Sequence, residues 1–229
     1  MGLVEDMGFS FHLYWDLPSP AQEVSVTLEV IEPPSVDRLY FWALQASFLG
    51  DAGPHGAAHL GLQWNPRFPD RTAVNWGGYD PRGVVLPGSE SSLPSSPQDQ
   101  NTRDFPWLPV RGYRLRILPS PEVGWRGEVT DMETGVVTVV RDLYVGGDHL
   151  GHVVVWSELF CECSDPRSVV SWSEPVAIGL GGEHLVPRAF RVNYKAEGCP
   201  NTNVYTDGGR VFQTTASERV TPQGSLVAV

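Results

Sequence analysis

The feature that most constrains the fold of this chain is a two-residue alternation of apolar and polar side chains. It is clearest at 24–30, 113–117 and 190–194. A period of two is typical of a β-strand with one buried and one solvated face. About a dozen segments have strand character, and no window has convincing helical spacing. Strands without intervening helices favour antiparallel sheets. The sequence therefore predicts an all-β fold with little or no helix, a two-sheet antiparallel β-sandwich, with a closed barrel as the alternative.

Turn-forming residues separate these segments. The 24 glycines and 20 prolines are spread along the chain, as expected where many short strands are connected by turns. The turn 131–135 lies between two β-rich runs, 123–130 and 136–141, and predicts a hairpin. The polar segment 83–107 is predicted to be a long loop, either a mobile insertion or a lid over a binding face. Because sandwiches of 229 residues are commonly one domain, residues 1–229 are expected to form a single domain.

The charge of the chain limits its partners. The formal net charge is −11, whereas a nucleic-acid-binding protein needs a basic surface that displaces counterions. An anionic membrane surface repels an acidic protein, and no apolar run approaches the length of a membrane span. We therefore expect neither nucleic-acid nor membrane partners. The oligomeric state stays open.

The N-terminus and the cysteines bear on the compartment. The first residues are acidic and no apolar stretch follows, which is unlike a signal peptide. The sequence therefore predicts a cytoplasmic protein, or alternatively a mature secreted domain with an added methionine. Three cysteines allow one disulfide, from Cys199 to either Cys161 or Cys163, or three reduced thiols.

Several strands carry polar residues on the face opposite their apolar side chains. Alternation assigns each residue to a face within its own strand, although it does not show that the polar faces of different strands lie side by side. If they do, one sheet presents amides, charges and a tryptophan suited to sugar recognition, because amides both donate and accept hydrogen bonds and an indole offers an apolar platform. The simpler interpretation is that these faces are polar because water covers them. The candidate ligand-binding residues are Gln45, His59, Gln63, Asn75, Arg126, Glu128, Trp156 and Glu158.

Three segments resemble a known superfamily. Residues 42–45 (Trp-Ala-Leu-Gln), 61–63 (Gly-Leu-Gln) and 74–80 (Val-Asn-Trp-Gly-Gly-Tyr-Asp) resemble early strands of bacterial concanavalin A-like, jelly-roll domains, several of unassigned function. The superfamily includes lectins, glycan-binding modules, glycoside hydrolases and polysaccharide lyases. The acidic strand of its laminarinase-like hydrolases and the lyase pattern are both absent here. The resemblance therefore implies binding of a carbohydrate or other small polar ligand rather than catalysis.

The favoured function is accordingly non-catalytic binding on the outer, concave face of one sheet. The alternative is a glycan-active enzyme, a glycoside hydrolase or polysaccharide lyase, that uses Glu128 and Glu158 as paired carboxylates. A second alternative is a protein–protein assembly module in which the valine-rich runs 136–140 or 153–155 lie at a sheet edge. No metal site and no cofactor are expected, although the resemblance leaves room for Ca²⁺ on loop carboxylates.

Overall fold

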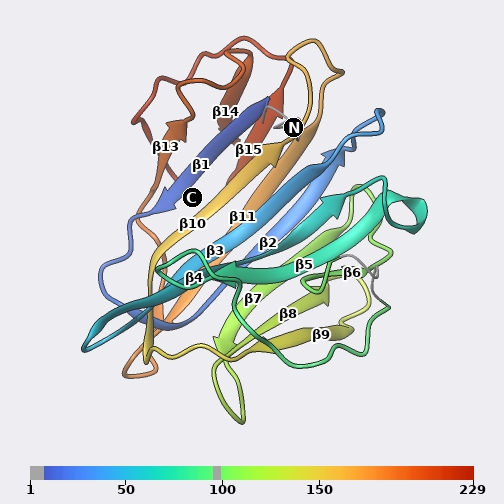
Figure 1. Ribbon diagram of the computed structural model, residues 1–229. Helices are drawn as coiled ribbons and strands as arrows, with labels where there is room; N and C mark the ends of the chain where they lie inside the picture. The colour runs from blue at the N-terminus through green and yellow to red at the C-terminus, as the bar shows by residue number, and fades with distance from the viewer. Residues whose placement is uncertain (1–7, 95–98) are drawn as a thin grey trace.

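The computed structural model describes residues 8–94 and 99–229, and almost all of its regular structure is antiparallel β-sheet (Figure 1). The strands form two sheets that pack face to face, so the predicted all-β sandwich is confirmed. The sheets join at one corner, where Leu150 pairs with Ala21. The only helical element among the described residues is a 3₁₀ turn, Pro69–Arg71.

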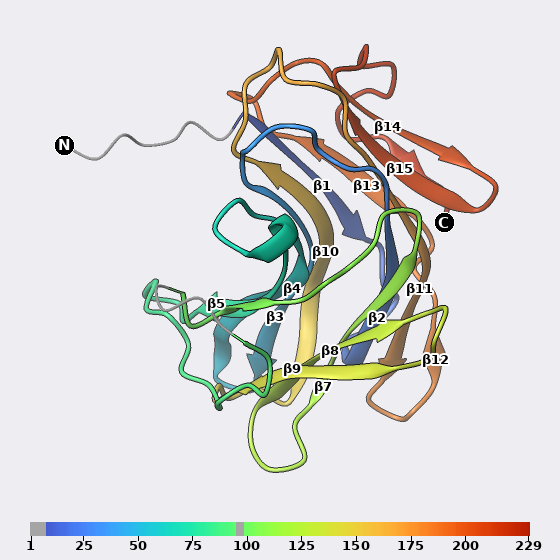
Figure 2. The ribbon, with the colours of Figure 1, turned by 90° about the vertical axis from the view of Figure 1, so that its right-hand side faces the viewer.

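We name the two sheets for the description that follows. The front sheet has the order β16 (Leu226–Val227), β13 (Phe190–Tyr194), β1 (Phe9–Trp15), β10 (His149–Leu159), β3 (Tyr40–Gly50), β4 (Gly53–Trp64), β5 (Thr72–Tyr79) and β6 (Thr102–Asp104). The back sheet has the order β14 (Thr202–Asp207), β15 (Arg210–Thr215), β11 (Val169–Gly179), β2 (Ala21–Glu32), β7 (Gly112–Pro119), β8 (Trp125–Asp131) and β9 (Val137–Leu143), with β12 (His184–Leu185) beside β11. Figure 2 shows the two sheets edge-on, with β10 curving along its length.

The core lies between the inner faces of the sheets, where the apolar half of each alternating pattern is buried. Phe48 of the front sheet stacks on Trp125 of the back sheet, with ring centroids 5.4 Å apart. A buried amide also links the sheets: Gln213 Oε1 accepts hydrogen bonds from Trp172 Nε1 and Ser157 Oγ, each at 2.8 Å. Because these groups satisfy one another, the core contains polar atoms at little cost.

The predicted hairpin is confirmed, because β8 and β9 pair across the turn at 131–135. Part of the predicted long loop at 83–107 packs against the sandwich. It contains β6, which extends the edge of the front sheet beside β5, and it buries Leu86 and Trp107. The predicted loop includes residues 95–98, which lie outside the described residues. The two valine-rich runs lie in different sheets. Residues 153–155 lie in β10, between β1 and β3, whereas 137–140 lie in β9, which pairs with β8 on one side and with Gly88 at Leu143 on the other.

Across the described ranges, no helix has the length and apolar character needed to cross a membrane. The compartment stays a prediction, as do the single domain and the exclusion of nucleic-acid partners.

Candidate functional site

The outer face of the front sheet is hollowed into a groove. One hollow, of about 680 Å³, lies over β3, β4 and β10, and a second, of about 880 Å³, adjoins it. Leu39 and Phe160 line both hollows, so the two adjoin. In Figure 2 the connection between β4 and β5, with its 3₁₀ turn, projects outward on this side of the sheet. Each hollow has a volume within the usual range of ligand pockets, about 300–1,000 Å³, and the two adjoin.

A row of three register partners crosses the floor of the groove. Glu158 on β10 pairs with Phe41 on β3, and Phe41 pairs in turn with Gln63 on β4. Two strand intervals separate the Cα atoms of Glu158 and Gln63, about 9 to 10 Å. Glu158 lines the smaller hollow and Gln63 the larger one. The carboxylate and the amide therefore lie on either side of Phe41, each lining a different hollow.

The two polar side chains of this row differ in their partners. The Glu158 side chain is 28% exposed, and its Oε1 lies 3.6 Å from His12 Nε2. Gln63 is buried, and its Oε1 accepts a hydrogen bond from Asn65 Nδ2 at 2.9 Å. This bond orients the amide so that the two N–H donors of Gln63 Nε2 are left for another acceptor.

Trp156 lies in the floor of the groove instead of standing exposed as the predicted platform, and that part of the prediction is wrong. It is only 3% exposed, and it forms a small apolar cluster with Phe41 and Val154 on the outer side of the sheet. Its ring meets that of Phe41 edge-on at 4.8 Å, and its Nε1 donates to Gln45 Oε1 at 3.1 Å. Bulky neighbours on adjacent strands cover it, an effect that alternation within one strand cannot reveal.

His59 lies beside Gln45, and both line the smaller hollow. Its ring packs edge-on against Phe41 at 5.4 Å and Trp156 at 5.7 Å. Burial lowers the pKa of His59 to about 4, because removal from water penalises the charged imidazolium more than the nearby Glu158 and Asp99 carboxylates favour it. The imidazole is therefore neutral at pH 7.

The structure brings together six of the eight predicted site residues on the outer face of the front sheet. These are Gln45, His59, Gln63, Asn75, Trp156 and Glu158. Asn75 does not reach the open groove, because it is buried beside β6 and donates from Nδ2 to Thr102 Oγ1 at 2.9 Å.

Arg126 and Glu128 are the two exceptions. Both lie on the outer face of the back sheet, where Arg126 pairs with Asp142 at 2.8 Å and Glu128 with Arg116 at 3.4 Å. Glu128 and Glu158 are thus on opposite faces of the molecule and cannot flank one glycosidic bond, which requires carboxyl groups at most about 9.5 Å apart. The predicted pair is wrong because alternation assigns a residue to a face of its strand but does not assign the strand to a sheet.

Sequence reasoning missed several residues of the groove, and two of them adjoin Glu158. Phe41 forms the centre of the floor, and His12, on β1, approaches Glu158. A signal for His12 was present in 9–15, where Phe9, Phe11 and Leu13 alternate with more polar residues.

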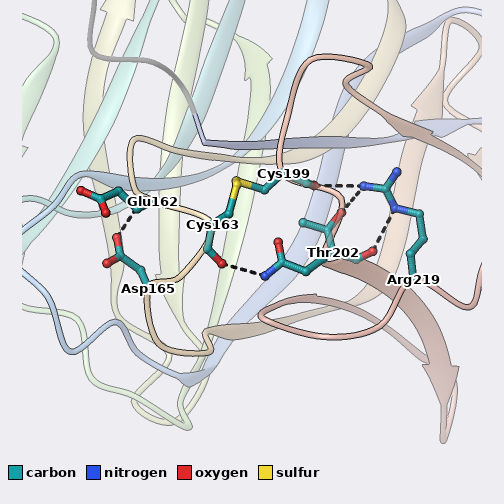
Figure 3. Close-up of a disulfide and its surroundings, with 7 residues drawn as sticks. Glu162, Cys163, Asp165, Cys199, Thr202 and Arg219 are labelled. Atoms are coloured by element: carbon teal, nitrogen blue, oxygen red, sulfur yellow. Dashed lines mark hydrogen bonds between the residues drawn. A yellow bond between two sulfur atoms is a disulfide. The ribbon is translucent and has the colours of Figure 1, made fainter.

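A disulfide forms part of the wall of the larger hollow (Figure 3). Cys163 pairs with Cys199 and joins the β10–β11 connection to the β13–β14 connection, while Cys161 is a buried free thiol. Hydrogen bonds hold the backbone on both sides: Asn201 Nδ2 donates to Cys163 O at 2.7 Å, and an Arg219 guanidinium nitrogen donates to Cys199 O at 3.1 Å. The choice between the two predicted pairings is therefore settled in favour of Cys163.

Residues 8–94 and 99–229 contain no group of three or more histidine, cysteine or acidic side chains arranged to hold a metal ion.

No family model matches the sequence, and no curated protein matches it. Solved structures do match. A crystal structure of Scytalido-glutamic peptidase with a peptide based transition state analog is similar with a TM-score of 0.51 at 11% identity, over 90% of this chain and 98% of that chain. A structure of scytalido-glutamic peptidase with a transition state analog inhibitor has a TM-score of 0.47 at 10% identity, over 91% and 98%. SCP-B, a member of the Eqolisin family of peptidases in complex with the tripeptide Ala-Ile-His, has a TM-score of 0.43 at 12% identity, over 90% and 96%.

These matches correct one expectation from the sequence. The sequence favours a non-catalytic protein, whereas the solved structure that is similar at a TM-score of 0.51 is a peptidase, and this finding contradicts the non-catalytic interpretation. The sandwich architecture implied by the concanavalin A-like resemblance is confirmed, but no family match supports that superfamily itself. At 11% identity the likeness establishes a shared β-sandwich fold over nearly the whole chain.

Proposed function

We propose that this protein is a peptidase that hydrolyses a peptide lying along the groove of the front sheet, with Glu158 as its proton-transfer group. The fold likeness to a peptidase that was crystallised with a peptide based transition state analog supports this choice of substrate. Because one fold hosts many functions, the likeness alone does not carry the proposal. The proposal depends on the groove and on the groups that it contains.

The observation that carries the proposal is the position of Glu158. It lines the smaller hollow, in the same row as Gln63, an amide that lines the adjoining larger hollow and whose oxygen is already bonded. Amide hydrolysis needs a group that takes a proton from water and returns it to the leaving nitrogen. It also needs a donor for the oxyanion of the tetrahedral intermediate. Glu158 and Gln63 supply these two chemical functions from opposite sides of Phe41.

The reaction that these groups support conserves protons and electron pairs. The Glu158 carboxylate takes a proton from a water molecule, and the water oxygen forms a bond to the carbonyl carbon of the scissile peptide unit. The carbonyl oxygen gains negative charge and accepts a hydrogen bond from Gln63 Nε2. The C–N bond then breaks, and protonated Glu158 returns its proton to the departing nitrogen. The carboxylate is regenerated, and no metal or cofactor is consumed.

The shape and lining of the groove favour an extended substrate. The smaller hollow is lined by aromatic and proline side chains such as Phe41, Tyr79 and Pro81, which provide apolar contact area. The larger hollow carries charged groups, among them Arg67 and Lys195. A polymer that crosses Glu158 would contact both hollows at once.

A matched pair of variants tests the proposal. Purified protein is incubated with a mixture of unstructured peptides from pH 3 to pH 8, and products are identified by mass spectrometry. Glu158→Gln is expected to lower kcat at least about a hundredfold, since proton transfer contributes about 10²–10⁴ to such rates. Glu128→Gln, the same change on the back sheet, is expected to leave cleavage unchanged. Absence of cleavage by the wild type, or equal activity of the two variants, would refute the proposal.

We also propose that the peptidase works in an oxidising compartment. The Cys163–Cys199 disulfide supports this, because such bonds persist mainly outside the reducing cytosol. Protein purified from its native compartment and denatured without reductant should therefore show one reactive thiol per chain, that of Cys161. Three reactive thiols would contradict the proposal.

A further inference from the structure

The floor of the groove contains a second pair of polar side chains, away from the Glu158 row. Gln45 on β3 and His59 on β4 are register partners, and both line the smaller hollow. Directly opposed residues on antiparallel strands have Cβ atoms about 4.5–5.5 Å apart. The two side chains therefore enter the groove together, as neighbours.

Gln45 has a free donor. Its Oε1 accepts the indole hydrogen of Trp156 at 3.1 Å, and this contact orients the amide. The two hydrogens on Nε2 are then left without an acceptor among the described residues.

His59 has a free acceptor. Its ring is held between Phe41 and Trp156, and no described residue forms a hydrogen bond with either ring nitrogen. A neutral imidazole carries one N–H donor and one acceptor nitrogen. Because His59 lines the smaller hollow, a ligand bound there can supply the missing partner.

A donor and an acceptor side by side match one residue of an extended peptide. The N–H and C=O of a residue in a β-strand point to the same side, which is why an opposed pair of strand residues can exchange both hydrogen bonds. A neighbouring strand normally supplies the complementary donor and acceptor. In the groove, two side chains present the same pair of functions.

We propose that Gln45 and His59 clamp the main chain of one substrate residue: Gln45 Nε2 donates to its carbonyl oxygen, and a His59 ring nitrogen accepts its amide hydrogen. This inference rests on the proposed peptidase function. The clamp recognises the backbone, so it fixes the register of the peptide whatever its side chains. Both residues act as positioning residues, because they hold substrate without taking part in proton transfer at Glu158.

Conservative variants separate the clamp from a structural role. His59→Phe keeps a planar ring against Phe41 and Trp156 but removes both nitrogens. It is expected to raise KM about tenfold, because the loss of one hydrogen bond worth about 1.4 kcal/mol corresponds to a tenfold change in affinity. The same variant should change kcat less than threefold. His59→Gln or His59→Asn restores an acceptor near one ring nitrogen, and one of the two is expected to recover most of the loss. His184→Phe, on β12 of the back sheet, is the matched control and should leave KM unchanged.

Gln45→Glu tests the other half of the clamp. It keeps an oxygen for the Trp156 indole but removes the amide donor, so it should raise KM by a similar factor. A KM within twofold of the wild type in both His59→Phe and Gln45→Glu would overturn the clamp.

N-methylation of the substrate gives the decisive test. A peptide that the wild type cleaves is resynthesised with one backbone amide methylated at a time. At one position the methyl group should raise KM about tenfold for the wild type and by less than twofold for His59→Phe, because the variant has no acceptor left to lose. Equal costs at every position for the two proteins would overturn the clamp while cleavage itself upholds the peptidase proposal. Failure of the wild type to cleave any peptide would overturn both.

Discussion

Acidification should destabilise this protein through His59. Burial in the groove floor lowers the pKa of this histidine from 6.5 to about 4. Between these two values the unfolded chain binds a proton that the folded chain does not. The free energy of unfolding therefore falls as the pH is lowered from about 6.5 to about 4, and this contribution is constant outside that window.

The size of the effect follows from the shift. At about 1.36 kcal/mol per pKa unit, the change in the pKa of His59 corresponds to about 3 kcal/mol. His59 is partly exposed in the groove, and solvent screening reduces the figure to about 2 kcal/mol. For a protein with an ordinary stability of about 5–15 kcal/mol, this loss is readily measured.

A comparison of the wild type with His59→Phe isolates the contribution of His59 to the pH dependence of the unfolding free energy. The carboxyl groups elsewhere titrate in both proteins, so their effect cancels. Urea unfolding is followed by tryptophan fluorescence at pH 7, 6, 5 and 4. The wild type is expected to lose about 2 kcal/mol more than the variant between pH 7 and pH 4. If the two proteins lose the same free energy over this range, His59 is not held neutral, and the electrostatic description of the groove floor is incorrect.

Three further perturbations have defined outcomes. Gly61→Ala would place a Cβ 2.0 Å from the Trp42 carbonyl oxygen, so it should destabilise the fold by about 1–3 kcal/mol, measurable as a lower Tm; an unchanged Tm would show that β3 and β4 are not packed as described. Trp156→Phe removes the donor to Gln45 Oε1 and should cost about 1 kcal/mol in urea unfolding, an expectation that an unshifted midpoint would contradict. Replacing Cys163 and Cys199 together by serine should cost about 2–4 kcal/mol under non-reducing conditions, and no loss in calorimetry would argue against the cross-link.

The strands of the sandwich could be predicted because alternation is a local property. The run at 190–194 is β13, and the turn at 131–135 joins β8 to β9. The assignment of strands to sheets could not be predicted, because pairing depends on contacts between residues far apart in the chain. Leu150 and Ala21, whose pairing joins the two sheets, are an example.

The difference between local alternation and long-range strand pairing also explains which residues of the candidate site could be predicted. Gln45, His59 and Glu158 were recognised because each is polar at a position where its strand turns away from the core. Glu128 satisfies the same criterion yet lies on the back sheet beside Arg116. The burial of Trp156 depends on Phe41 of a neighbouring strand, and that contact is set by register. Sequence alternation therefore identifies candidates, and only the pairing of strands selects among them.

The central claim, that Glu158 and Gln63 act on a peptide bound across the front sheet, is tested most directly by a crystal structure with a peptide-based transition-state analogue. We expect the analogue to lie along the groove, with its tetrahedral centre between the Glu158 carboxylate and Gln63 Nε2, each within about 3.2 Å of one of its oxygens. An analogue bound on the back sheet, or one bound in the groove with its tetrahedral centre away from Glu158, would contradict the claim.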